Sequence, residues 1–366
     1  MKPISVTSFL FLSQSVLCLP AMAQNALSVP MEVVHVSNPD LAAESRGSVT
    51  LYRIHPQYTL QLEQDSARTE LSLGAMIERS SNTDLSANRS LPSVRVNWTN
   101  SSPVSVFGLQ ASLEEASTRE TEFAEFGRVA RDSKSRTGTV GTTWTHNFSA
   151  EDSLELAATH ARVSYDSDLF IPYRETRGAA TYGKRVGPNA RYSLSASVSR
   201  LNTDAPELDA NRGEIGVGYQ ADLSEGLTFN LGVGAVRTTG ANPDTDPVAS
   251  LRLEYTGERV GYAVSWAREV SAGGSLGGYS RSQGFDASMT YPLSINTTLS
   301  LGVGHTKSLE AESDAGAIVF ARLRSELNRF WAFTVGLEHR RAMPAVGPSG
   351  RGNSVAVGLV YSHPDF

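Results

Sequence analysis

Apolar side chains recur at every second position along most of the chain, and residues 353–366 show the pattern clearly. Val355, Val357, Leu359 and Tyr361 stand two apart, and mostly small or polar residues fill the gaps. Side chains on a strand alternate between two faces, so this spacing predicts a strand with one apolar face. From about residue 69 onward we count about sixteen such segments, each about ten residues long, which is the length that a tilted strand needs to cross a membrane.

The links between these predicted strands alternate between short and long. Residues 149–152 and 223–226 are examples of short links, whereas residues 80–92 and 114–136 are long ones. Bacterial outer-membrane barrels have short periplasmic turns and long outer loops, while a soluble sandwich has no reason for this alternation. The pattern therefore predicts an all-β fold, a single transmembrane antiparallel up-and-down β-barrel.

The N-terminal region predicts export and leaves the strand count open. Residues 1–23 combine Lys2, an apolar run and Ala21-Met22-Ala23, which is a small-x-small cleavage signature, so we expect a signal peptide. The single cysteine, Cys18, lies inside it. Residues 24–66 form either a periplasmic lead-in or a first hairpin, and residues 67–366 form the barrel. The count is about sixteen strands, or eighteen if residues 47–65 join the barrel.

Composition excludes several classes of function. Hydrophobic residues make up 40% and charged residues 19% of the chain, and the net charge is −6. No basic cluster is present, so we expect no nucleic-acid partner. No paired-histidine metal spacing occurs, and we expect no metal and no cofactor. The pair His160 and Ser164 comes nearest to a catalytic constellation, but we assign no catalytic residue and expect no enzyme.

Aromatic residues on the predicted apolar faces gather beside the short links. Amphipathic rings are stable at the boundary between lipid and water, so this position predicts a ring at the periplasmic interface. Its members are Trp98, Phe148, Tyr192, Tyr219, Tyr255, Tyr262, Tyr291 and Trp331.

The opposite face is mostly Gly, Ser and Thr, with a few charged residues. Charge on a lipid face costs about 2–4 kcal/mol near the midplane, so we expect these side chains in the lumen. They are Arg95, Glu214, Arg252, Glu254, Arg322, Arg324, Glu338 and Arg340. Two interpretations are open: these residues line a constriction that selects solutes by charge, or they form cross-strand ion pairs that fill and stiffen the lumen. The charge-rich residues 114–136 fold inward as a plug or lie outside.

These features together resemble a Gram-negative outer-membrane β-barrel protein. The resemblance implies an outer-membrane location, contact with outer-membrane lipid, and recognition of Tyr361 and Phe366 by the barrel-insertion machinery. Residues 192–204, 250–278 and 291–306 are similar to barrels of exopolysaccharide export systems, which implies a surface polysaccharide or export partners.

Three functions follow from these patterns. The leading hypothesis is a pore or accessory export conduit, and a surface polysaccharide is the candidate cargo. The alternative is a structural or surface-binding barrel with a closed lumen. The third is an outer-membrane lipid hydrolase.

Overall fold

The computed structural model of the chain describes residues 22–127, 132–240, 243–273, 277–310 and 313–364. The predicted signal peptide lies outside this part of the chain except for Met22 and Ala23, and so does Phe366 of the predicted insertion signal.

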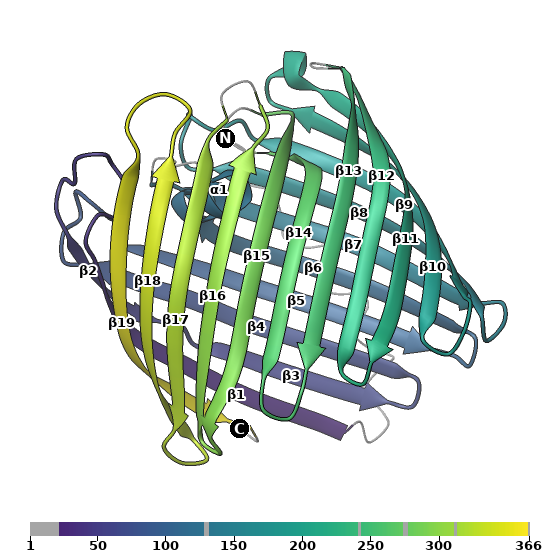
Figure 1. The fold of residues 1–366 in the computed structure, drawn as a ribbon, viewed down its shortest axis with the longest axis horizontal. Helices are drawn as coiled ribbons and strands as arrows, with labels where there is room; N and C mark the ends of the chain where they lie inside the picture. The colour runs from purple at the N-terminus through teal and green to yellow at the C-terminus, as the bar shows by residue number, and fades with distance from the viewer. Residues whose placement is uncertain (1–21, 128–131, 241–242, 274–276, 311–312, 365–366) are drawn as a thin grey trace, which may run out of the picture.

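One antiparallel sheet closes on itself to form the barrel (Figure 1). Strands that follow one another in the sequence pair with each other, except β2 and β3, and β1 pairs with β19 from Leu27↔His363 to Val36↔Ser354. The strands are β1 Met22–Val36, β2 Val49–Ile54, β3 Gln57–Gln64, β4 Ala67–Ser80, β5 Arg89–Ser101, β6 Ser105–Ser117, β7 Lys134–Asn147, β8 Asp152–Tyr165, β9 Tyr173–Arg185, β10 Ala190–Thr203, β11 Ala210–Ser224, β12 Leu227–Gly240, β13 Asp244–Thr256, β14 Gly261–Ala272, β15 Tyr279–Ser294, β16 Thr297–Ser308, β17 Ala315–Glu326, β18 Trp331–Met343 and β19 Gly350–His363.

The labelled strands β2 and β3 occupy a single position in the wall. Both pair with β1 on one side and with β4 on the other, and the interruption between them falls at His55 and Pro56. The barrel therefore has eighteen strand positions, which confirms the higher of the two predicted counts.

The partner of this interrupted strand is β1, and not a second strand within residues 47–65. Residues 24–36 thus belong to the barrel wall rather than to a periplasmic lead-in. The sequence did not predict this strand because it contains Pro30, and proline cannot donate a ladder hydrogen bond. Pro30 lies between the stretch of β1 that pairs with β3 and the stretch that pairs with β2, and its carbonyl accepts a hydrogen bond from the His55 N–H at 2.9 Å.

The wall is apolar outside and polar inside, as the alternation predicts. On β10 and β11, Leu194, Val198 and Ile215 are 59%, 69% and 65% exposed, and they alternate with serines and glycines. Such exposure is costly in water, and lipid removes the cost. The exposed apolar face is therefore the membrane-facing one.

Helical structure is confined to the long links. Helix α1, Thr118–Phe126, follows β6, and a 3-10 turn η1, Pro206–Leu208, follows β10. Gly127 ends α1 in the left-handed region at φ 67°, and its N–H donates to the carbonyls of Glu122 and Phe123. Within the described residues, no helix has the length and apolarity to span a membrane.

Candidate functional site: a lumen crossed by a helix

The long link between β6 and β7 folds into the barrel and does not lie outside it. Helix α1 begins at the β6 wall and contacts β16 and β17, which are far from β6 around the barrel. Figure 1 shows it behind the strands of the front wall. Nine residues give a helix about 14 Å long, enough to cross a large part of the lumen. Of the two placements left open for residues 114–136, the described residues 114–127 and 132–136 have the inward one.

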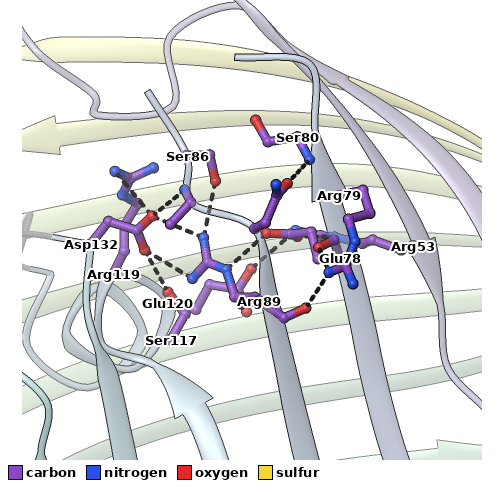
Figure 2. Close-up of polar contacts among 12 residues, drawn as sticks. Arg53, Glu78, Arg79, Ser80, Ser86, Arg89, Ser117, Arg119, Glu120 and Asp132 are labelled. Carbon is purple, nitrogen blue, oxygen red and sulfur yellow. Dashed lines mark hydrogen bonds and ion pairs between the residues drawn. The ribbon is translucent and has the colours of Figure 1, made fainter. Parts of the chain in front are cut away.

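A buried ion-pair network attaches both ends of this link to the wall, through Glu120 near its start and Asp132 near its end (Figure 2). Arg89 of β5 donates two hydrogen bonds to Asp132, at 2.8 and 3.0 Å, and its Nε lies 2.9 Å from Glu78 of β4. Arg53 of β2 contacts the other oxygen of Glu78 at 2.6 Å and Glu120 of α1 at 3.4 Å. The side chains of Glu78 and Arg89 are only 1% and 7% exposed, so these charges depend on one another for stabilisation.

Close backbone contact attaches the far end of α1. The Thr306 hydroxyl of β16 donates to the Ala124 carbonyl at 3.1 Å. A Cβ atom on Gly127 would lie 2.6 Å from the Thr306 carbonyl oxygen, and a Cβ on Gly316 would lie 3.0 Å from the Phe123 ring. Two glycines are therefore required where the helix meets β16 and β17.

Helix α1 leaves unequal spaces on its two sides. Toward β1, β18 and β19 the remaining cavity is about 90 Å³, and Val34, Leu41 and Phe123 line it together with Arg53 and Arg340. Along the inner face of β9–β14 the space is about 620 Å³. A further cavity of about 390 Å³ lies along β3–β6. Of these three spaces, the one along β9–β14 is the largest.

Small residues line the β9–β14 wall, and a polar network borders it. Ser193, Ser195, Gly216, Gly218, Gly232 and Gly234 are among its lining residues. Arg212 donates to Glu214 and to the Val270 carbonyl, at 2.6 Å in both cases, and Arg177 lies 3.4 Å from Glu214. The Tyr279 hydroxyl lies 3.0 Å from Glu175. Of these, the sequence did not predict Glu175, Arg177, Arg212 or Tyr279, since periodicity does not show which inward residues converge across strands.

Glu125 of α1 has a carboxyl group whose pKa is raised well above its ordinary value. Desolvation by the enclosing walls, followed by the charges of Glu122 and Glu269, raises the pKa of Glu125 from 4.5 to about 7. This group therefore changes charge near neutral pH within the narrowed part of the lumen.

All eight predicted lumen residues lie on the face opposite the exposed apolar side chains, but they form separate groups, and Glu214 belongs to the network with Arg177 and Arg212 described above. Arg322 and Arg324 of β17 are opposite Gly336 and Thr334, and Glu338 and Arg340 of β18 are opposite Phe320 and Ile318, so the four side chains are spread along two neighbouring strands. Glu338 pairs with Arg340 at 2.6 Å and with Arg322 at 3.7 Å, whereas Arg324 forms no ion pair with another described residue. Arg340 also lies 5.6 Å from the centre of the Phe123 ring on α1.

The other three form two pairs elsewhere in the wall. Arg252 and Glu254 of β13 contact each other at 2.8 Å, and Arg95 of β5 lies 4.0 Å from Glu114 of β6. Both pairs are about half exposed, so they face water in the lumen. Ion pairing and selection by charge are thus compatible here, and a role in selectivity stays a prediction.

The aromatic residues form cross-strand pairs near the short turns. Tyr192 faces Tyr219 with ring centres 5.0 Å apart, and Tyr255 faces Tyr262 at the same distance. Trp331 faces Tyr361 at 5.1 Å. Phe148 and Tyr291 are also exposed, at 60% and 42%, and Trp98 lies 6.0 Å from the Phe107 ring. The interfacial ring is therefore compatible with the structure and stays a prediction.

His160 and Ser164 lie on the outer face of β8. Their register partners are Val140 and Arg136, and the His160 Nδ1 lies 2.9 Å from the Thr176 hydroxyl. The pair therefore does not face the lumen.

Comparison with known proteins agrees on the fold. No family model and no curated protein matches the sequence. The outer-membrane protein OpdK of Pseudomonas aeruginosa has a similar structure, with a TM-score of 0.54 and 9% identity, over 93% of this chain and 99% of that one. The structure of OpdK with vanillate gives a TM-score of 0.53 and 11% identity, again over 93% of this chain and 99% of that one. OccAB4 of Acinetobacter baumannii gives 0.53 and 7%, over 93% of this chain and 98% of that one. This chain has the fold of an outer-membrane β-barrel.

Proposed function

We propose that this protein is an outer-membrane channel for small polar solutes, narrowed by α1. The observation that carries the proposal is the unequal division of the lumen: the helix fills one side and leaves a space of about 620 Å³ along β9–β14. An eighteen-strand wall is wide enough for a water-filled passage unless something closes it. The serines and glycines of β9–β14 keep this side free of bulky side chains.

Charged groups along the lumen would favour one sign of ion. On β17 and β18, three arginines face the lumen, and the carboxylates on the same face are those of Glu338 and of Glu326 at the end of β17. We expect Arg324, which has no ion-pair partner among the described residues, to contribute most per charge. Vanillate, the anion found with OpdK, is an aromatic carboxylate, and small organic acids of this kind are suitable first solutes to test here.

Planar-bilayer recording of the purified protein tests the channel. We expect stable conductance steps, and we expect Arg324→Gln to shift the reversal potential in a salt gradient toward cations. Arg341→Gln is the matched control, because Arg341 lies on β18 with the opposite facing. A wild-type protein that is folded but never conducts would refute the channel and favour the barrel with a closed lumen.

Export of a surface polysaccharide is a narrower proposal, supported by the sequence resemblance alone. A polymer would have to pass α1, so the channel recorded above must also accept long oligosaccharides. We expect them to block the current only briefly if they pass through. Blockage that increases with oligosaccharide length and never clears would count against export.

A further inference from the structure

Four arginines lie on the outer, membrane-facing side of neighbouring strands, close to the long-loop end. They are Arg162 of β8, Arg174 of β9, Arg200 of β10 and Arg237 of β12, and all four are exposed. Arg200 comes two residues after Val198, which is 69% exposed on the lipid face. At about 3.3 Å per residue, the arginine lies about 7 Å further along the tilted strand in the direction of the long-loop end. The long-loop end is the outer side of such barrels, so these guanidinium groups lie at the level of the outer leaflet.

The register of two of these arginines is unfavourable unless an anion is present. Arg162 and Arg174 are directly opposed across β8 and β9, and like charges in that position destabilise a sheet. None of the four forms an ion pair with another described residue, although the Arg200 Nε donates to the Asn202 side chain at 3.1 Å. Arg136 of β7 differs, because Glu115 neutralises it at 2.5 Å.

A hollow in the lipid-facing wall lies beside the arginines on the same strands. Its volume is about 620 Å³ and its lining is almost wholly apolar. Small residues form this hollow. A Cβ atom added to Gly178 or Gly213 would have no neighbouring heavy atom within 4 Å. Arg237 lines its edge, and the lining is completed by Ala180, Ala196, Val198, Ile215 and Ala235 among others.

We propose that this surface binds a phosphate-bearing lipid of the outer leaflet, with the phosphate between Arg162, Arg174 and Arg200 and an acyl chain in the hollow. Phosphate oxygens accept hydrogen bonds from several guanidinium groups at once and relieve the repulsion between the opposed pair. The hollow favours a lipid over a free phosphate ion, because a phosphate ion has no apolar part that could fill an apolar groove. The order along the membrane normal, charge outermost and apolar groove deeper, is the order within a lipid molecule. This site does not rest on the channel function, because it lies on the other face of the wall.

Native mass spectrometry of the full-length mature protein, released from detergent with added diphosphoryl lipid A, tests the site. We expect the wild type to retain one more lipid than Arg162→Gln/Arg174→Gln at the same concentration. The apparent affinity of this site should fall about 25-fold, since each of the two lost cations near a membrane surface weakens binding about fivefold. Dephosphorylated lipid A should not be retained, and a large excess of inorganic phosphate should not displace the diphosphoryl form.

Two further variants separate charge from shape. Gly178→Leu/Ala196→Leu fills the hollow with side chains that point toward lipid, and we expect it to lose the same lipid although the arginines remain. Arg79→Gln, an exposed outward arginine on β4, should leave the retained number unchanged. Heat-modifiable gel mobility checks that each variant is folded. Equal retention by wild type and Arg162→Gln/Arg174→Gln would overturn the proposal, and so would displacement by inorganic phosphate, which would indicate a plain anion site.

Discussion

Replacing Arg89 by methionine should release α1 from the wall without unfolding the barrel. Arg89 lies between Glu78, which is 1% exposed, and Asp132, which is 13% exposed. Methionine keeps much of the side-chain volume but removes both hydrogen bonds to Asp132 and one of the two cations beside Glu78. The long inter-strand ladders do not involve these side chains, so the damage should fall on the inward link.

The size of the effect follows from burial. Removing one partner from a buried ion pair costs about 3–5 kcal/mol, because the other charge stays buried without compensation. Glu78 keeps Arg53 at 2.6 Å, so we take the lower value, about 3 kcal/mol. At about 1.4 kcal/mol per factor of ten, the undocked population of the link rises about 100-fold.

Hydrogen exchange of the α1 amides measures this directly, because exchange through local opening follows the opening free energy. We expect α1 amides to exchange about 100-fold faster in Arg89→Met, whereas amides in the middle of β11 should be unaffected. Arg79→Met is the control, since Arg79 donates only to the backbone carbonyls of Glu78 and Arg89. Unchanged α1 exchange in a folded Arg89→Met protein would refute the idea that this network holds the helix inside the lumen.

Three other substitutions test neighbouring parts of the structure. Gly127→Ala should weaken the docking of α1 by about 1–2 kcal/mol from its φ of 67° alone, seen as faster exchange of the same amides. The pKa of Glu125 is raised to about 7, so this carboxyl is neutral below that pH and charged above it. The preference of the channel for cations should therefore rise between pH 6 and 8 in reversal-potential measurements, and the free energy of unfolding should fall as the pH rises from 4.5 toward 7. Glu125→Gln should abolish both trends. Val217→Arg places a charge on the lipid face and should lower the free energy of unfolding in urea by about 2–4 kcal/mol, whereas Ser195→Arg, on the lumen side of β10, should cost far less.

Local rules were enough to predict the wall of the barrel. A strand places alternate side chains on opposite faces, so the apolar positions near Leu194 and Val355 revealed the lipid face without any knowledge of their neighbours. The charged residues at even positions of β17 and β18 were assigned to the lumen for the same reason. The one strand that escaped, β1, contains Pro30, and proline is acceptable there only because the pairing partner changes from β3 to β2 beside it.

The contents of the lumen depended on the tertiary structure. Residues 114–136 carry no periodic signal that distinguishes an inward link from an outer loop. The distinction comes from Glu78 and Arg89 on β4 and β5, which stabilise the link from one wall, and from Gly316 on β17, whose missing side chain admits the helix at another. The outward row of Arg162, Arg174 and Arg200 is likewise invisible in sequence order, because its members come together only through strand register. The sequence alone determined that residues alternate between lipid and lumen, since that depends on the chain's own geometry. The closed sheet decided which distant side chains meet, because register and curvature belong to the whole barrel.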